Sequence, residues 1–487
     1  MDIVLLTACV GKEFKLFRTL GTYQIAWYLR NFDYQVQVID FIHKFSEDQI
    51  WKLVEKYVTA DTKIVGYSPM IDFSEHGEYN NKIERILLRI KKKYPHVKII
   101  AGGASAQSFV KKYRNKSLFD VIFMGHAEDT MLAFCNHIFR GAQSLAFEKM
   151  EGNVIIRETI PLPQIKEKFD INKCTHTWSD NDFIQSRETL PIELGRGCVF
   201  ACKFCQYPYI GKAKNDFTRE MELVREEMMR NYEQFGTTRY YMVDDTFNAD
   251  RNRLVEFTKM VKTLPFKLDY ATYLRLDLIF KWPEQEELLP ESGLVSCFFG
   301  VESFNQQAAD LVGKGWQNKK VKDYLPELYH NKWKGEISPR VGLICGLPPE
   351  TFDEMKSTHD WLVQNKMPSW YWAHLQINRD RINTYTSEFE RNAEKYGFSF
   401  ENDNGRIIWS HRLYNERQAE DMTITLNNMS KPYTTPSWMP LLELGNYTDD
   451  LKLYRATAHD NIDWNPIRQG RLDFLKTYYL QLLRQPI

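Results

Sequence analysis

The chain has 487 residues, of which 43% are hydrophobic and 14% aromatic, so it can bury several cores and is not a disordered chain. Its 64 basic and 64 acidic residues balance, which argues against a strongly electrostatic binder of nucleic acid. The eight cysteines do not form a disulfide framework, and no apolar run is long enough to span a bilayer. The composition therefore predicts a cytoplasmic protein that does not act at a membrane.

Residues 1–145 alternate short apolar strand patterns with amphipathic helical patterns. The strand patterns lie at 2–6, 36–40, 63–68, 97–103 and 120–125. This α/β alternation predicts a parallel, doubly wound, Rossmann-like sheet, whose ligands bind beyond the carboxyl ends of the strands. The residues that fall at those ends are Ser68, Gly102, Gly103 and Gly125.

Residues 146–188 have the pattern of a linker. Pro161 and Pro163 break regular structure, and residues 179–182 are turn-like. A second domain is expected over 189–398, with its first strand at 189–193.

The loop after that strand carries the most distinctive motif of the chain, C-x3-C-x2-C, made by Cys198, Cys202 and Cys205. Three thiolates on one short loop can bind three irons of a 4Fe–4S cluster and leave the fourth iron open. The alternatives are a zinc knuckle, although zinc usually takes four protein ligands in a structural site, and a coincidence of loop cysteines.

This motif resembles the signature of the radical S-adenosylmethionine (SAM) enzymes. The resemblance implies a cluster held by the three cysteines, whose open iron binds the amino and carboxylate groups of SAM. The reduced cluster would then cleave SAM to a 5′-deoxyadenosyl radical. It further implies that Phe204 shields the cluster and abuts SAM, and that an electron donor such as flavodoxin or ferredoxin reduces the cluster.

Further strand patterns follow the motif at 240–245, 268–274, 295–299, 340–345 and 372–377. Together with the strand at 189–193 they resemble the partial (β/α)6 barrel of radical SAM enzymes. Catalytic residues of α/β barrels lie at the carboxyl ends of the strands.

Acidic and basic residues close the second and third of these strands. Asp244 and Asp245 resemble the D-D-x-F segment of the cobalamin-type members, and carboxylates suit the SAM ammonium group. The alternative is that they cap a helix. Arg275 resembles the R-x-D segment and could pair with the SAM carboxylate, or simply with Asp277.

The fourth, fifth and sixth strands end in further family-like segments. The run 299–303 resembles G-x-E-S, which implies hydrogen bonds from Glu302 and Ser303 to SAM, and Lys314 resembles the lysine that often follows. The run 341–351 resembles G-L-P-x-E-T. The resemblance of this run to the family segment implies that its backbone approaches the adenine of SAM at Gly342 and Leu347. The position of the sixth strand implies the same for the backbone at Gln376. His374 is interpreted as a buried histidine.

The first domain resembles the cobalamin-binding domain that precedes many radical SAM domains. This resemblance implies cobalamin contacts at Ser68, Gly102, Gly103, Gly125 and Glu128. The chain lacks a complete D-x-H-x-x-G motif, and the usual G-E-G-E is Gly-His-Ala-Glu at 125–128. A Rossmann-like domain that only serves as a scaffold is the alternative.

Residues 399–487 are expected to form a mainly helical cap domain. An amphipathic helix over 471–485 would cover the barrel and shape the substrate pocket.

The sequence thus predicts a radical SAM enzyme with a 4Fe–4S cluster, SAM and cobalamin. We expect it to use cobalamin to methylate an unactivated carbon of a small molecule or a peptide. The alternatives are a radical SAM cyclase, epimerase or rearrangement enzyme with a degenerate cobalamin domain, and a non-catalytic iron–sulfur binding protein.

Overall fold

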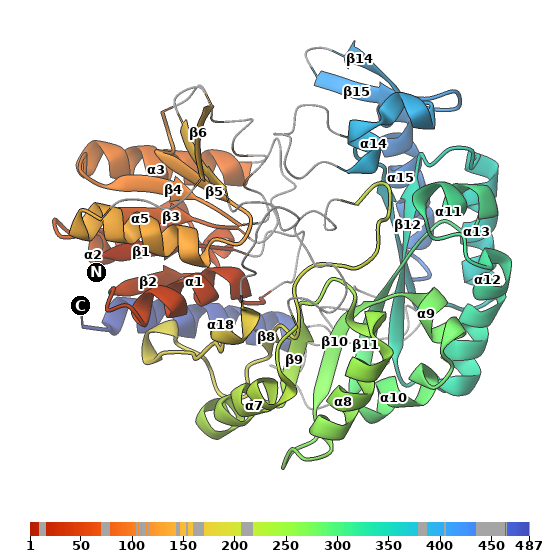
Figure 1. Cartoon of the computed structure of the whole chain (residues 1–487), viewed down its shortest axis with the longest axis horizontal. Helices are drawn as coiled ribbons and strands as arrows, with labels where there is room; N and C mark the ends of the chain where they lie inside the picture. The colour runs from red at the N-terminus through yellow and green to blue at the C-terminus, as the bar shows by residue number, and fades with distance from the viewer. Residues whose placement is uncertain are drawn as a thin grey trace. The chain divides into compact units, whose positions relative to one another are not determined.

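The computed structural model describes residues 1–8, 16–69, 78–103, 106, 109, 113, 117–142, 147–151, 154–158, 170–205, 218–377, 387–403, 406–434, 463 and 465–486 (Figure 1). The chain divides into two compact units. The first comprises Met1–Pro191, Arg230–Thr237 and Asn465–Ile487, and the second comprises Ile192–Met229 and Thr238–Trp464. Among the described residues, no helix is both long and apolar enough to cross a membrane.

The first unit is built on a seven-stranded sheet with the order β2-β1-β3-β4-β5-β7-β6. The strand bounds are β1 Ile3–Leu6, β2 Val36–Ile39, β3 Ile64–Tyr67, β4 Lys98–Ala101, β5 Val121–Met124, β6 Phe147–Glu151 and β7 Val154–Glu158. All pairs are parallel except β6 with β7. β1 pairs with β2 on one side and β3 on the other, so the strand order reverses there, as in doubly wound sheets. The predicted Rossmann-like sheet is confirmed.

Helices connect these strands. They are α1 Leu20–Arg30, α2 Glu47–Tyr57, α3 Glu78–Lys93 and α5 Glu128–Arg140, with the short helix η1 at Ile42–Lys44. α2 begins at a capping box, in which Ser46 and Gln49 satisfy each other's backbone N–H groups. Its apolar face is buried through Ile50, Leu53 and Val54.

The β6–β7 hairpin lies within residues 146–188, which were expected to be a linker. β7 pairs in parallel with β5, in the register Val121↔Ile155, and so extends the sheet. The run Val154-Ile155-Ile156 carries the β-branched signal of a strand, which the linker interpretation overlooked. Pro161 and Pro163 lie outside the described residues. η3 Ile171–Lys173 and η4 Asp180–Asp182 follow.

The helix expected over 471–485 is α18, Asn465–Arg484, and it belongs to the first unit. This differs from the expectation that it covers the barrel. Tyr57 donates its hydroxyl to the carbonyl of Leu482 at 2.6 Å, and Lys56 donates to the carbonyls of Leu482 and Leu483 at 2.7 and 2.8 Å. The last carbonyls of a helix lack partners within it, so this lysine from α2 both bonds them and complements the helix dipole.

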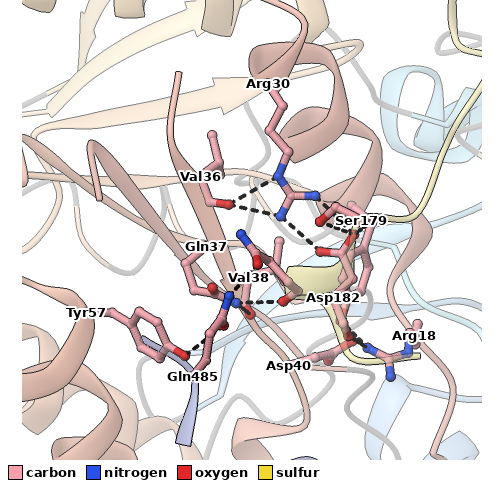
Figure 2. A network of polar contacts seen from close by, with 12 residues as sticks. Arg18, Arg30, Val36, Gln37, Val38, Asp40, Tyr57, Ser179, Asp182 and Gln485 are labelled. Carbon is pink, nitrogen blue, oxygen red and sulfur yellow. Dashed lines mark hydrogen bonds and ion pairs between the residues drawn. The ribbon is translucent and has the colours of Figure 1, made fainter. Parts of the chain in front are cut away.

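Segment 170–190 is fixed to α1 and to the residues just before it by two ion pairs. In Figure 2 the guanidinium of Arg30 lies between the carbonyl of Val36 and the carboxylate of Asp182, at 2.9 Å from each. Arg18 is fully buried and pairs with Glu188 at 2.6 Å. Removing one partner of such a buried pair leaves an uncompensated charge, which costs about 3–5 kcal/mol.

The second unit contains a six-stranded sheet whose order, β13-β12-β11-β10-β9-β8, follows the chain without interruption. The bounds are β8 Leu190–Ile192, β9 Arg239–Met242, β10 Asp269–Leu274, β11 Leu294–Glu302, β12 Ser338–Cys345 and β13 Ser369–His374. The pairs from β9 to β13 are parallel. This is the predicted partial (β/α)6 arrangement.

Helices follow the strands of this unit. They are α7 Met221–Phe235, α8 Arg251–Val261, α9 Leu276–Lys281, α10 Gln285–Glu291, α11 Gln306–Val312, α12 Asn318–Pro326 and α13 Phe352–Gln364, with η5 Phe247–Ala249 and the π-helical η6 Glu327–Lys332 between them. The remaining elements are α14 Glu388–Arg391, η8 Ala393–Tyr396, the antiparallel hairpin of β14 Ser399–Asp403 and β15 Arg406–Ser410, and α15 Glu416–Ser430.

Helix α15 packs against β13, the last strand of this sheet. Asn427 accepts a hydrogen bond from the backbone N–H of Trp372 at 3.1 Å and donates one to its carbonyl at 2.8 Å. Its side-chain amide therefore takes the place of a neighbouring strand. Sheet edges that are left unpaired invite association with other chains, and this contact closes one. The domain boundaries predicted at 145, 188 and 398 stay predictions.

Candidate cofactor site

The cysteine motif lies on the loop that follows β8. Cys198, Cys202 and Cys205 are half-buried and form no disulfide, and the N–H of Cys205 donates to the carbonyl of Cys202 at 3.0 Å. The loop is tied to the rest of the unit by a bond from the N–H of Lys203 to the carbonyl of Val312. A short, turn-like loop thus holds three thiols that are accessible for metal binding.

Side chains from two neighbouring strand ends contact these thiols. Thr246, after β9, places its hydroxyl 3.3 Å from the Sγ of Cys198. Arg275, after β10, donates from Nη1 to the Sγ of Cys202 at 3.7 Å. Both lie at carboxyl ends of parallel strands, where barrel enzymes place their reactive groups.

The environment of Cys202 is electropositive. Burial raises the pKa of its thiol, and the nearby charges of Lys314 and Arg275 act in the opposite direction. A thiolate formed here, for example as a metal ligand, would be stabilised by both cations.

Arg275 is held on several sides. It forms a two-bonded ion pair with Asp277 at 3.0 and 2.6 Å, and its guanidinium lies 4.1 Å from the ring centre of Phe200. Its backbone N–H donates to the side-chain oxygen of Asn248 at 2.9 Å. Arg275 therefore forms the ion pair with Asp277 and the contact with Cys202 at the same time.

The two aspartates after β9 do not have the alternative role of helix caps. Asp250 caps α8, accepting from the N–H of Arg253 at 3.0 Å. Asp244 is buried and accepts from the N–H of Leu194 at 2.9 Å, which joins the end of β9 to the start of the cysteine loop. Asp245 lies beside it, and its carbonyl accepts from the hydroxyl of Thr246.

The G-x-E-S segment ends β11 in a left-handed turn. Glu302 has φ +69°, and its carboxylate pairs with Lys314 at 2.7 Å. A Cβ on Gly300 would lie 3.0 Å from the Nζ of Lys314, so glycine makes room for this pair. Ser303 is buried and donates its hydroxyl to Glu350 at 2.7 Å.

Glu350 is a residue to which sequence analysis gave no role. Burial raises the pKa of its carboxyl to about 7. The G-L-P-x-E-T motif, which contains Glu350, was the available signal for a role of this residue. Its hydrogen-bond partner Ser303, however, lies at the end of a different strand, β11. Thr246 was likewise given no role, although it follows Asp244 and Asp245 directly.

The residues expected at the adenine have different surroundings. A Cβ on Gly342 would lie 2.3 Å from the ring of Phe298, so this glycine admits an aromatic side chain of the neighbouring strand. Leu347 is completely buried, whereas Gln376 is exposed. Phe204 is half-buried on the cysteine loop.

In the first unit, the expected cobalamin residues gather at the ends of β3, β4 and β5. A Cβ on Gly103, which has φ +85°, would lie 2.9 Å from the hydroxyl of Ser68. Gly102 precedes it, and Gly125, with φ +80°, follows β5. Glu128 is instead buried in the first turn of α5, where its carboxylate accepts from the thiol of Cys174 at 3.7 Å.

Hydroxyl groups that sequence analysis did not consider lie at the same edge. Thr7, after β1, has its hydroxyl 2.7 Å from that of Thr19 and 3.0 Å from that of Thr22, and it donates to the carbonyl of Ser68. These described hydroxyls and the backbone beside them contribute neutral polar groups to this edge.

Comparison with known proteins identifies the second unit. Residues 192–362 match the family model described as the radical SAM superfamily. Residues 192–362 therefore form a radical SAM domain. The match spans β8 to α13 and includes the cysteine motif.

Relatives of this radical SAM enzyme include methyltransferases. It is 22% identical over 408 residues to cytidylyl-2-hydroxyethylphosphonate methyltransferase of Streptomyces wedmorensis, which covers 70% of this chain and 72% of the relative. A radical SAM methyltransferase of Kitasatospora setae, TsrM, solved with cobalamin and a 4Fe–4S cluster, matches with a TM-score of 0.65. That match covers 97% of this chain and 99% of TsrM at 16% identity.

A second solved structure, the cobalamin-dependent SAM radical enzyme OxsB with aqua-cobalamin and SAM, matches with a TM-score of 0.56 at 16% identity. The match covers 81% of this radical SAM chain and 56% of OxsB. At these identities the two structural matches show the fold, a Rossmann-like sheet followed by a radical SAM sheet and a helical C-terminal part.

Proposed function

We propose that this chain is a cobalamin-dependent radical SAM methyltransferase that methylates an unactivated carbon of its substrate. The observation that carries the proposal is the cysteine triad beside the carboxyl ends of β9 and β10, within the residues that match the radical SAM family. A Rossmann-like unit on the same chain, and methyltransferases among the relatives, support the cobalamin-dependent form.

The cysteine loop fits a 4Fe–4S cluster. Cys198, Cys202 and Cys205 lie half-buried on one loop and form no disulfide, and three thiolate ligands leave one of four irons open. Arg275 and Thr246 can donate to the thiolates, and such contacts tune metal centres. We assign cluster ligation to the three cysteines.

Residues at the strand ends would position SAM. Asp244 and Ser303 are already bonded to Leu194 and Glu350, so we assign them to shaping the site. We assign direct SAM contacts to the other expected residues, namely Phe204, Asp245, Arg275, Glu302 and the backbone near Gly342, Leu347 and Gln376.

The edge of the first unit's sheet fits a large neutral cofactor. The carboxyl ends of β1, β3 and β4 present hydroxyls and glycines, and Gly103 brings its backbone close to Ser68. We assign cobalamin contacts to Ser68, Gly102, Gly103 and Gly125. When bound, the cluster and SAM supply a 5′-deoxyadenosyl radical, and methylcobalamin supplies the methyl group.

One observation favours a second candidate, a radical SAM rearrangement without cobalamin. Glu128, the acidic residue of the altered Gly-His-Ala-Glu segment, is buried against Cys174. A first unit that binds no cobalamin would act only as a scaffold. In either case we expect the substrate to be a small molecule or a peptide and the reductant to be a flavodoxin or a ferredoxin.

The test is an anaerobic incubation of the cluster-reconstituted protein with SAM, reductant and methylcobalamin, analysed by mass spectrometry. We expect 5′-deoxyadenosine and S-adenosylhomocysteine from the wild type and neither from the Cys198→Ala/Cys202→Ala/Cys205→Ala variant. Absorbance of the protein after gel filtration reports bound cobalamin independently of turnover. Retained cobalamin supports methyl transfer, whereas 5′-deoxyadenosine formed by a protein that retains no cobalamin supports the rearrangement. Failure of the reconstituted protein to bind SAM would refute both.

A further inference from the structure

Three side chains of metal-binding type meet at the outer edge of the second unit's sheet. His374 ends β13, and Glu416 and Glu420 lie on the first two turns of α15. One ligand atom from each, an imidazole nitrogen and two carboxylate oxygens, all lie within 4.8 Å of one another. The Nε2 of His374 is 3.7 Å from the Oε1 of Glu420. None of these residues belongs to the proposed cluster, SAM or cobalamin contacts.

The spacing of the two glutamates suits a shared ligand. Residues four apart on a helix lie on the same face, one turn above the other. His374 approaches that face from the strand, so the three side chains come from two separate elements. Convergence from two elements is what distinguishes this cluster from a run of acidic residues on a solvated helix.

The scaffold behind the cluster is fixed by hydrogen bonds. Asn427 bonds both backbone groups of Trp372, two residues before His374, and thereby sets the position of α15 along β13. Trp409 connects the other side, because its indole N–H donates to the carbonyl of Leu375 at 2.9 Å and its backbone N–H donates to Glu416 at 3.4 Å. Ligands held in this way lose little conformational freedom on binding.

The charges of the cluster favour a divalent cation. Glu416 is only 6% exposed, and its carboxylate is held in place by the backbone N–H of Trp409. Two carboxylates at this spacing repel each other. A divalent ion bound between the two carboxylates would reduce this repulsion and would take the imidazole in its neutral form as a third ligand.

We propose that His374, Glu416 and Glu420 bind one divalent first-row transition-metal ion, of which Zn²⁺ is the representative. One nitrogen and two carboxylate oxygens match the ligand preferences of zinc, and imidazole disfavours Mg²⁺ and Ca²⁺. Three protein ligands leave a coordination position for water or a substrate oxygen, at the carboxyl end of the last strand of the barrel. The ion would also join β13 to α15.

The test uses the full chain with Cys198→Ala, Cys202→Ala and Cys205→Ala, because the cysteine thiols would themselves bind zinc. Zn²⁺ is titrated by isothermal titration calorimetry in the presence of excess Mg²⁺. We expect one equivalent to bind, and we expect His374→Ala and Glu420→Gln each to weaken binding at least tenfold. His330→Ala and Glu394→Gln, which alter a histidine and a glutamate of the same unit outside the cluster, should leave the affinity unchanged.

Thermal unfolding provides a second measurement, because it shows for each variant both whether it is folded and whether Zn²⁺ stabilises it. Zn²⁺ should raise the Tm of the cysteine-free parent and of His330→Ala, and should not raise that of Glu420→Gln, whose substitution conserves side-chain size. The proposal is overturned if the parent binds no Zn²⁺, if Mg²⁺ displaces it, or if the affinity of the folded Glu420→Gln variant equals that of the parent. None of these results depends on whether the cysteines bind a cluster.

Discussion

Arg275 donates a hydrogen bond from its guanidinium to the Sγ of Cys202, at a distance of 3.7 Å. The same guanidinium pairs with Asp277 and stacks on Phe200, so its position is set from three sides. Because this fixed cation lies beside Cys202, the electrostatic environment of Cys202 differs from that of the other two cysteines. The effect of Arg275 on a bound cluster can be measured.

Replacing Arg275 with Met should lower the reduction potential of a reconstituted cluster. The reduced cluster carries one more negative charge, and loss of a charge-assisted bond worth about 1.5–3 kcal/mol penalises that state most. An EPR-monitored redox titration measures the change. Lys281→Met removes an exposed cation from the same unit and should leave the potential unaltered. An unchanged potential in Arg275→Met, with full iron content, would contradict a role for Arg275 at the cluster.

The stability contribution of Glu350 should depend on pH. Burial raises the pKa of its carboxyl to about 7 in the folded state, above the ordinary value of 4.5. The folded state therefore binds a proton more tightly than the unfolded state. Its contribution is complete below about pH 4.5 and is lost as the pH rises through about 7.

The matched variant for this prediction is Glu350→Gln, which keeps an acceptor for Ser303 but does not titrate. Between pH 5 and pH 8 the wild type should lose up to about 3 kcal/mol of unfolding free energy relative to this variant. Urea unfolding at both pH values measures the difference. If the gap between the two proteins is the same at pH 5 and pH 8, Glu350 does not have the raised pKa.

Removing the side chain of Lys56 should loosen the end of α18. The ammonium bonds the carbonyls of Leu482 and Leu483, and a cation at a helix C-terminus contributes about 0.3–2 kcal/mol. Hydrogen exchange of residues 465–486 should accelerate in Lys56→Met. Lys52→Met alters an exposed lysine on the same helix, α2, and provides the comparison. Equal exchange in both variants would show that Lys56 does not hold α18.

Asn427 and Asn428 provide an internally matched pair for the edge of β13. Asn427→Ala leaves the N–H and the carbonyl of Trp372 without their partner, which should cost about 1–3 kcal/mol. Asn428 is exposed, and its replacement by Ala should change stability by less than about 0.5 kcal/mol. Denaturant unfolding compares them, and light scattering reports whether the exposed edge promotes association. Similar stabilities for the two variants would argue against the strand-like role of Asn427.

Much of the fold could be predicted because its signals are local. The strands from β1 to β5 and from β9 to β13 each carry an apolar run, and a parallel sheet follows from the helices between them. The closeness of Thr246 and Arg275 to the cysteine loop follows from the same rule, because carboxyl ends of neighbouring parallel strands share one edge.

The remaining features depend on partners far away in the chain. Tyr478 accepts from the N–H of Asp40 at 2.9 Å, a contact between residues 438 positions apart, and helical periodicity alone gives no indication of it. Gly342 was expected to approach a ligand. In the structure, the ring of Phe298 on the neighbouring strand β11 occupies the space where a side chain at 342 would lie. Ser303 was expected at SAM and Glu350 had no expected role, and only the structure shows that the two are hydrogen-bonded.

The placement of α18 has a consequence for how the protein is made. The ring of Phe41, in the first unit, packs edge-on against Phe474 and Tyr478 of α18. Residues 1–191 leave the ribosome long before this helix is synthesised, and at about 5–20 residues per second they wait many seconds for it. Until then the aromatic surface around Phe41 and Tyr57 stays uncovered, so the first unit starts to be translated before the second unit but is completed after it. Chaperones that recognise exposed aromatic side chains therefore have their longest opportunity at the N-terminal part of this chain.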